Sequence, residues 1–139
     1  MSACDEEPCK SLIDRYWATA IDGWEAQLAV RLHCDLLKRA ERDYWILFSL
    51  WAAAFAYAVA CAALGLPAPL CAALTLASFA LLAALAVWTV RIARLRRLLA
   101  RYQEACRRRY SEMLSLRRQI AVRCPRECQP EAVRIECGC

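Results

Sequence analysis

Four cysteines near the C-terminal end of the chain are the residues best suited to chemistry. They are Cys124, Cys128, Cys137 and Cys139, spaced as C-x3-C and then C-x-C. Four thiolates can hold a zinc ion tetrahedrally, although common zinc sites use two C-x2-C pairs. The alternative is a flexible, redox-sensitive tail over residues 124–139, and no cofactor other than this zinc is expected. In a cytoplasmic setting the cysteines should be reduced thiols rather than disulfides.

Arginines between residues 91 and 123 form a second group with chemical potential. Arg109 is the most specific of them, because it interrupts an apolar heptad and should point toward the axis of a helical bundle. With Arg108 and Arg101 it can bind an anion such as a nucleotide or oligonucleotide, or attract anionic lipid headgroups. The alternative is a solvated helix face that pairs with acidic residues of the chain. No stable binding of double-stranded DNA is expected.

Residues for catalysis are not arranged in any familiar way. His33 is the only histidine, and a single helical histidine more often packs or faces solvent than catalyses. The sequence has no Gly-rich phosphate loop, no nucleophile elbow and no paired carboxylates in an apolar setting. We therefore predict that the chain is not an enzyme.

The element that must position these groups is a charge-free stretch over residues 44–90. It holds two apolar runs, about 45–64 and 70–90, separated by a turn over 65–69 that contains Gly and Pro. A helix of about 20 residues is roughly 30 Å long, which matches the hydrocarbon core of a bilayer. Hiding both runs in a soluble core would need a thicker shell than the largely charged remainder supplies. The sequence therefore predicts a hairpin of two transmembrane helices.

Basic residues flank this hairpin on one side only. Lys38, Arg39 and Arg42 precede the first run, four arginines follow the second, and the turn between them carries no charge. The positive-inside rule places both termini in the cytoplasm. The bias toward Ala, Leu and Arg indicates a bacterial chain, and hence the inner membrane.

Amphipathic helices are expected before and after the hairpin, which makes the fold all-α. Residues 1–43 carry a net charge of −3 and residues 91–139 a net charge of +8, so antiparallel arms should attract each other. Asp5 and Pro8 mark the start of the first arm, and Gly23 predicts a bend. Its apolar stripe consists of Ile13, Trp17, Ile21, Trp24, Leu28, Leu32 and Leu36. The heptad of the second arm, residues 91–123, consists of Ile92, Leu95, Leu99, Tyr102, Cys106, Arg109, Met113, Leu116 and Ile120. Together they predict a helical bundle or stalk.

Alanines repeat every four residues on two faces of the first membrane helix. One face holds Ala52, Ala56 and Ala60, and the other Ala54, Ala58 and Ala62. Small residues at this interval let helices approach closely. One face suffices for the hairpin, so the second predicts a homo-oligomer in the bilayer. A pore through it would be lined by the hydroxyl residues Ser49, Tyr57, Thr75, Ser78 and Thr89.

Two short segments carry a family resemblance. One runs from Arg31-Leu32-His33 through Lys38-Arg39-Ala40-Glu41-Arg42 to Trp45, and the other comprises Arg101-Tyr102-Gln103-Glu104 and Arg109-Tyr110. With the hairpin between them they resemble the SLATT proteins, two-transmembrane effectors of bacterial nucleotide-signalling defence systems. The resemblance covers residues 11–120 and leaves out the cysteine-rich tail. It implies an oligomeric pore that depolarises the inner membrane on infection, and a partner enzyme that produces the activating nucleotide.

Two functions are therefore expected. The first is an oligomeric pore or channel-like effector in the inner membrane, gated through its cytoplasmic helices by a signal such as a nucleotide. The alternative is a non-conducting membrane anchor or scaffold whose coiled coil recruits a partner protein. The absence of charged residues from the membrane runs keeps the second alternative open.

Overall fold

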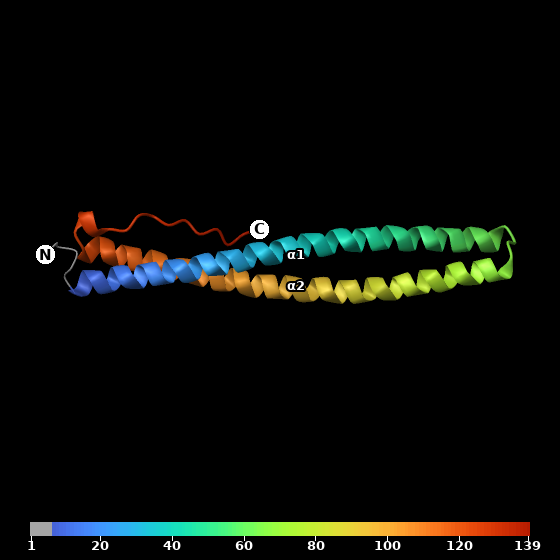
Figure 1. The fold of residues 1–139 in the computed structure, drawn as a ribbon, viewed down its shortest axis with the longest axis horizontal. Coiled ribbons are helices and arrows are strands. Elements are labelled where there is room, and N and C mark those ends of the chain that lie inside the picture. The colour runs from blue at the N-terminus through green and yellow to red at the C-terminus, as the bar shows by residue number, and fades with distance from the viewer. Residues whose placement is uncertain (1–6) are drawn as a thin grey trace. The chain divides into compact units, whose positions relative to one another are not determined.

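Two long helices joined by a short turn make up most of the computed structural model, which describes residues 7–139 (Figure 1). Helix α1 spans Glu7–Ala63, helix α2 spans Ala68–Arg123, and a short 3-10 helix, η1, spans Arg126–Cys128. The rest of the tail has no regular secondary structure, and no strand occurs within residues 7–139. The all-helical hairpin is thus confirmed. Of the two residues predicted to mark the start of the first arm, Asp5 lies outside the described residues, and Pro8 lies in the first turn of α1.

The turn between the helices is shorter than the sequence predicts. Gly65 has a φ of 65°, in the left-handed region that favours glycine. This conformation lets the N–H of Leu66 donate to the carbonyl of Cys61 at 3.2 Å, which closes the end of α1. Helix α2 already begins at Ala68, so Pro69 lies in its first turn, where a missing N–H is tolerated. Ala68 and Pro69 of the predicted turn therefore belong to α2.

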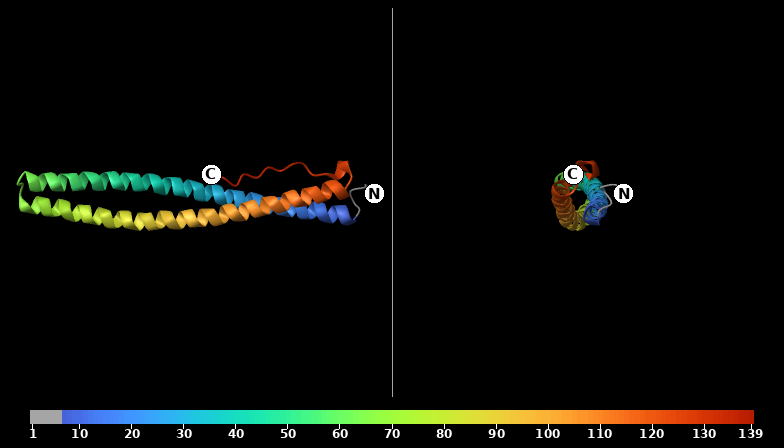
Figure 2. Two further views of the ribbon diagram at one scale, coloured as in Figure 1. Left: turned by 180° about the vertical axis from the view of Figure 1, so that it is seen from behind. Right: turned by 90° about the vertical axis from the view of Figure 1, so that its left-hand side faces the viewer.

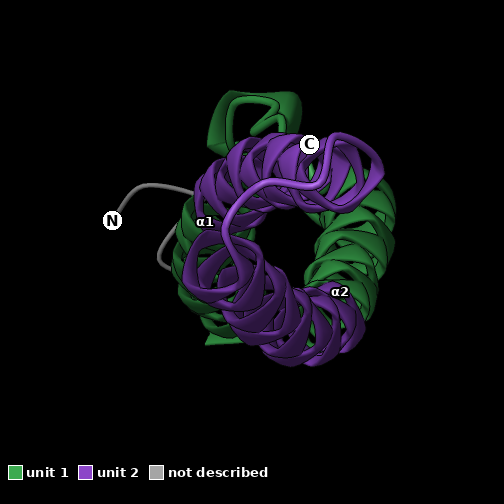
Figure 3. Cartoon of the chain, turned by 90° about the vertical axis from the view of Figure 1, so that its right-hand side faces the viewer, with its two compact units in different colours: residues 1–34, 98–139 green, residues 35–97 purple. Residues whose placement is uncertain are grey.

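Each long helix passes through two compact units, coloured separately in Figure 3. The arm unit comprises residues 1–34 and 98–139, and the hairpin unit comprises residues 35–97. Neither helix breaks where the sequence predicts a change from arm to membrane segment. On each side of the turn, the arm segment and the predicted membrane segment therefore belong to one continuous helix.

In the arm unit, α1 and α2 run antiparallel, and the tail returns alongside them (Figures 1 and 2). Both helices bury residues at a seven-residue interval, which is the repeat of a coiled coil. Helix α2 buries Leu99, Cys106, Met113 and Ile120, and α1 buries Cys9, Tyr16, Gly23 and Val30. The predicted α2 heptad has a second row of residues, which includes Tyr102 and Arg109. This row is less buried than the first, since both of these residues are exposed.

The apolar stripe predicted for α1 is not the stripe that this structure buries. Trp17, Ile21 and Leu28 are exposed by 38%, 53% and 66%. The covered face lies beside it and consists of Leu12, Tyr16, Ala20, Gly23, Val30 and Cys34. Leu12, Tyr16, Ala20 and Gly23 each directly precede a residue of the predicted stripe, so the two stripes share one spacing and differ by a rotation of one residue about the helix axis. The larger apolar residues therefore remain outside.

The hairpin unit pairs the two charge-free helical segments. Ser78 and Leu85 of α2 are buried, and Ala54 and Ala58 of α1 are half-buried. In the most apolar 18-residue stretch of each helix, few residues are buried: 6% of them in α1 and 11% in α2. Among the described residues, two helices are thus long and apolar enough to cross a membrane. Ala56, on the other predicted face, is exposed.

Candidate functional site

Disulfides hold the arm unit together and correct the expectation of reduced thiols. Cys9–Cys124 joins the beginning of α1 to the end of α2, with the Cα atoms 5.7 Å apart. Cys106–Cys137 joins α2 to the tail, and Cys34–Cys139 joins α1 to the tail. Cys128 is also disulfide-bonded. The tail is therefore fixed covalently to both helices rather than free.

The four tail cysteines do not form a zinc cluster in this structure. Cys124, Cys137 and Cys139 are bonded to three different sites on the helices. A disulfide sulfur is not the thiolate that zinc requires. No group of three or more potential metal ligands is present in residues 7–139. A zinc ion at Cys124, Cys128, Cys137 and Cys139 stays a prediction for the reduced chain alone.

Non-covalent contacts also hold the tail against α1. The hydroxyl of Tyr16 donates to the carbonyl of Glu131 at 3.0 Å, and the N–H of Val133 donates to the same hydroxyl at 3.4 Å. Gly23 faces the buried Ile135, and a Cβ on residue 23 would overlap the Cδ1 of that isoleucine. The glycine that predicted a bend therefore gives the tail room to lie close to α1.

The predicted anion-binding arginines do not converge on one point. The Arg109 guanidinium lies 3.9 Å from the Asp22 carboxylate of α1 and 3.3 Å from that of Glu112. Arg108 pairs with Glu104 at 3.2 Å within α2. Arg101 has no ion-pair partner in residues 7–139. Arg109, the charged residue that interrupts the apolar heptad of α2, thus forms an ion pair with Asp22 of α1.

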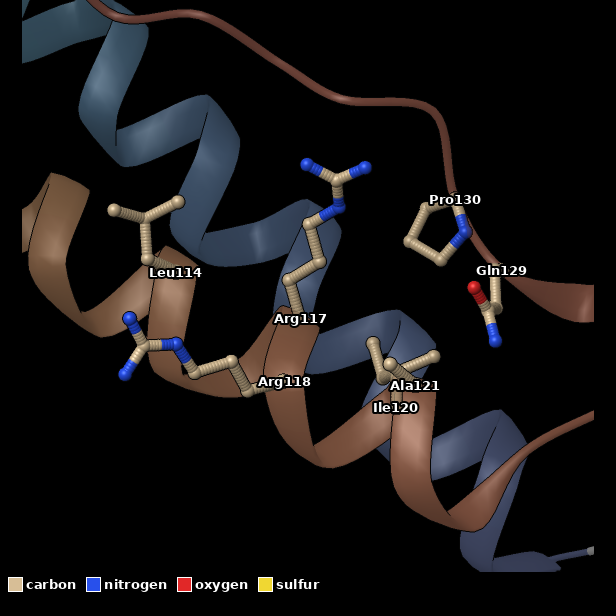
Figure 4. Close-up of a pocket in the computed structure, with 7 residues that line it drawn as sticks. All are labelled: Leu114, Arg117, Arg118, Ile120, Ala121, Gln129 and Pro130. Carbon is tan, nitrogen blue, oxygen red and sulfur yellow. The ribbon is translucent and has the colours of Figure 1, made fainter. Parts of the chain in front are cut away.

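A cavity with two other arginines lies where the tail turns back over α2 (Figure 4). Its volume is about 320 Å³, and its lining includes Arg117, Arg118, Gln129 and Pro130. Arg117 extends toward Pro130, whereas Arg118 points along α2 away from the tail. The sequence shows the adjacent basic residues but not this cavity, because the cavity depends on the path of the tail.

The predicted pore-lining hydroxyls do not form one row. Ser49 donates to the Trp45 carbonyl at 2.9 Å. Thr75 and Thr89 likewise donate to carbonyls of their own helix, and Tyr57 is exposed. Thr75 and Ser78 line one cavity of about 300 Å³, together with apolar side chains. Ser49, Thr75 and Thr89 therefore satisfy carbonyls of their own helix, and a pore lined by these hydroxyls stays a prediction.

His33 packs against an aromatic ring rather than against a reactive group. Its ring lies 4.5 Å from that of Tyr102, measured between centroids. Its Nδ1 lies 2.7 Å from the carbonyl of Ala29, which makes Nδ1–H the donor. These contacts fit a packing residue between the two helices.

The most distinctive surface of the arm unit is apolar. We call it the outer stripe, and it consists of Trp17, Ile21, Trp24, Leu28 and Leu32, all exposed on α1. Single exposed apolar residues are ordinary, but a contiguous row of large ones marks an interaction surface. The sequence identifies these residues as apolar and periodic, but it predicts that they pack against the second arm, whereas they are exposed.

No protein-family model, curated protein or solved structure matches this chain. The resemblance to the SLATT family therefore stays a prediction.

Proposed function

We propose that the chain is a non-enzymatic membrane anchor whose disulfide-bonded arm unit presents an assembly surface. The outer stripe carries this proposal, because large apolar side chains are exposed on a helix that bonds and packing already hold in place. A rigid surface loses little conformational entropy on binding. The arm unit thus has the properties of a docking platform.

The hairpin unit supports the membrane part of this proposal. Exposed side chains such as Phe55, Leu76 and Phe79 cover its two apolar segments. In water these surfaces would be unfavourable by about 25 cal/mol for each Å², whereas lipid tails solvate them. The contact face uses small residues such as Ala54 and Ala58, as in helix pairs within membranes.

The orientation must satisfy both the charges and the disulfides. Basic flanks on both membrane segments favour a cytoplasmic arm unit. Disulfides are rare in most cytoplasms but abundant inside hyperthermophilic archaea and bacteria. We therefore propose that the arm unit faces a cytoplasm that maintains structural disulfides, with the hairpin in the cell membrane. Protease added outside intact cells should leave the arm unit uncut, and cleavage there would reverse this orientation.

Reconstitution distinguishes the anchor from the pore. The oxidised protein is inserted into sealed vesicles with a potassium gradient, and a potential-sensitive dye reports ion flow. An anchor leaves the gradient intact with and without added nucleotides. Sustained depolarisation that depends on the protein would reject the anchor in favour of the pore.

The pore remains a second candidate because one cavity brings two hydroxyls together. Thr75 and Ser78 line it beside Trp51 and Phe55 of α1. Polar side chains in such a position can contribute to a gated path in an oligomer. If vesicles do conduct, Ser78→Leu should reduce the current, and Ser49→Leu serves as a matched control whose hydroxyl bonds to its own helix.

A further inference from the structure

The outer stripe is not covered by any other segment within residues 7–139, and its acidic neighbours likewise have no partner there. Leu28 and Leu32 are exposed by 66% and 60%. Asp14 and Glu25 lie on the same exposed side of α1 and have no ion-pair partner in residues 7–139. The surface therefore combines an apolar centre with unneutralised negative charge, and it fits a basic partner with small apolar residues.

The exposed face of α2 has those complementary properties. A groove of about 460 Å³ is lined there by Ala100, Arg101, Glu104, Ala105 and Arg108. Glu104 pairs with Arg108, whereas Arg101 has no ion-pair partner in residues 7–139, so the lining keeps a net positive charge. Further along the helix, Arg118 is exposed and has no ion-pair partner in the described chain. Small alanines leave room for the side chains of another helix, and the arginines attract its carboxylates.

Contacts between α1 and α2 show which residues of the two helices lie at the same position along the long axis of the arm unit. Asp22 lies beside Arg109, with 3.9 Å between the charged groups, and His33 lies beside Tyr102. Because the helices are antiparallel, Leu28 is level with the neighbourhood of Ala105. Glu25 is level with Arg108 and Asp14 with Arg118. The acidic, apolar and basic features therefore match along the whole arm unit.

We propose that the outer stripe binds the α2 groove face of a second copy of this chain. Two copies inserted in the same direction in one bilayer hold identical residues at identical depths. Residues of α1 that are level with residues of α2 in one copy are therefore also level with those residues in the neighbouring copy. Leu28 then lies over Ala105, while Glu25 and Asp14 face Arg108 and Arg118 of the second copy. Each copy has both faces, so the contact is heterologous and repeats around an axis to form a closed ring.

This inference deepens the proposed function, on which it rests, by naming the occupant of the docking platform. A photoreactive benzoyl-phenylalanine at position 28 tests it in membranes of cells that make the full chain. Illumination should give a covalent dimer, and mass spectrometry should locate the link within residues 100–108 of the other copy. The same probe at Arg15, which is exposed away from the outer stripe, is the matched control and should give at least tenfold less dimer.

Charge reversal gives a second, independent readout. Asp14→Arg should lower the dimer yield roughly threefold, as expected for one exposed ion pair. Adding Arg118→Glu in the same chain should restore the dimer yield. At every contact in the ring, an arginine at position 14 of one copy then faces a glutamate at position 118 of the next. Loss without restoration would overturn the proposed pairing.

The outcomes separate this inference from the membrane proposal. Alkaline carbonate extraction first tests whether the chain is integral to the membrane. A chain released by carbonate rejects the membrane anchor itself. If the chain is inserted but crosslinks only to other proteins, or only between the outer stripes of two copies, the membrane-anchor proposal stands and the ring proposal is rejected.

Discussion

Gly23 of α1 lies directly under Ile135 of the tail, and a methyl group on residue 23 would overlap the end of that isoleucine. The tail is therefore positioned by a missing side chain as well as by disulfides. Ile135 is buried, although it lies in a segment without regular secondary structure. The arm unit is accordingly a packed assembly of two helices and a tail.

Gly23→Ala should destabilise the arm unit despite the higher helix propensity of alanine. Overpacking of a close contact typically costs about 1–3 kcal/mol. Chemical unfolding in micelles, followed by circular dichroism, measures the change. Ile135→Val removes the overlapping Cδ1 and should recover most of the loss in the double variant. Gly138→Ala, where nothing lies within 4 Å, should be nearly neutral. Equal effects at Gly23 and Gly138 would contradict the close packing.

Replacing Cys9 and Cys124 together by serine should also destabilise the arm unit. This disulfide joins residues 115 positions apart, but the other disulfides already shorten the loop that it closes, so it should contribute about 2–4 kcal/mol. The same unfolding measurement reports the difference. The matched control is Cys61→Ser with Cys71→Ser, since neither thiol is in a disulfide. A loss no larger than that of the control would show that packing alone holds the arm unit.

Arg109 and Asp22 should contribute little to stability as a pair. Both side chains are about half exposed, and exposed pairs generally contribute less than about 1 kcal/mol. A double-mutant cycle of Arg109→Ala and Asp22→Ala gives the coupling energy directly. The second carboxylate at Glu112 should lower it further. Coupling above about 2 kcal/mol would mean that the pair is a principal determinant of helix register.

Cys61 and Cys71 should become linked under mild oxidation. Their sulfur atoms are 2.6 Å apart, next to the turn of the hairpin. Thiols held in such proximity on two neighbouring helices form a disulfide without large backbone movement. Peptide mapping before and after treatment with an oxidant detects the new bond, and the bonded arm cysteines serve as an internal reference. Two thiols that remain open to alkylation would contradict the close approach.

The hairpin could be predicted from the sequence, because its signal is local. Residues 44–90 lack charge, and Gly65 followed by Pro67 ends one helix before another begins. The α2 heptad could likewise be read from spacing, and Leu99, Cys106 and Met113 are indeed buried. Such patterns depend only on residues close together in the chain, so they need no knowledge of what lies opposite.

Tertiary structure alone decided which face of α1 is covered and how the cysteines pair. Large apolar residues such as Trp24 predicted the contact, yet the seven-residue row through Gly23 provides the closer fit to α2 and the tail. Cys34 meets Cys139 across 105 positions of sequence. Neither choice follows from composition or spacing, because both depend on surfaces that meet only when distant segments fold together.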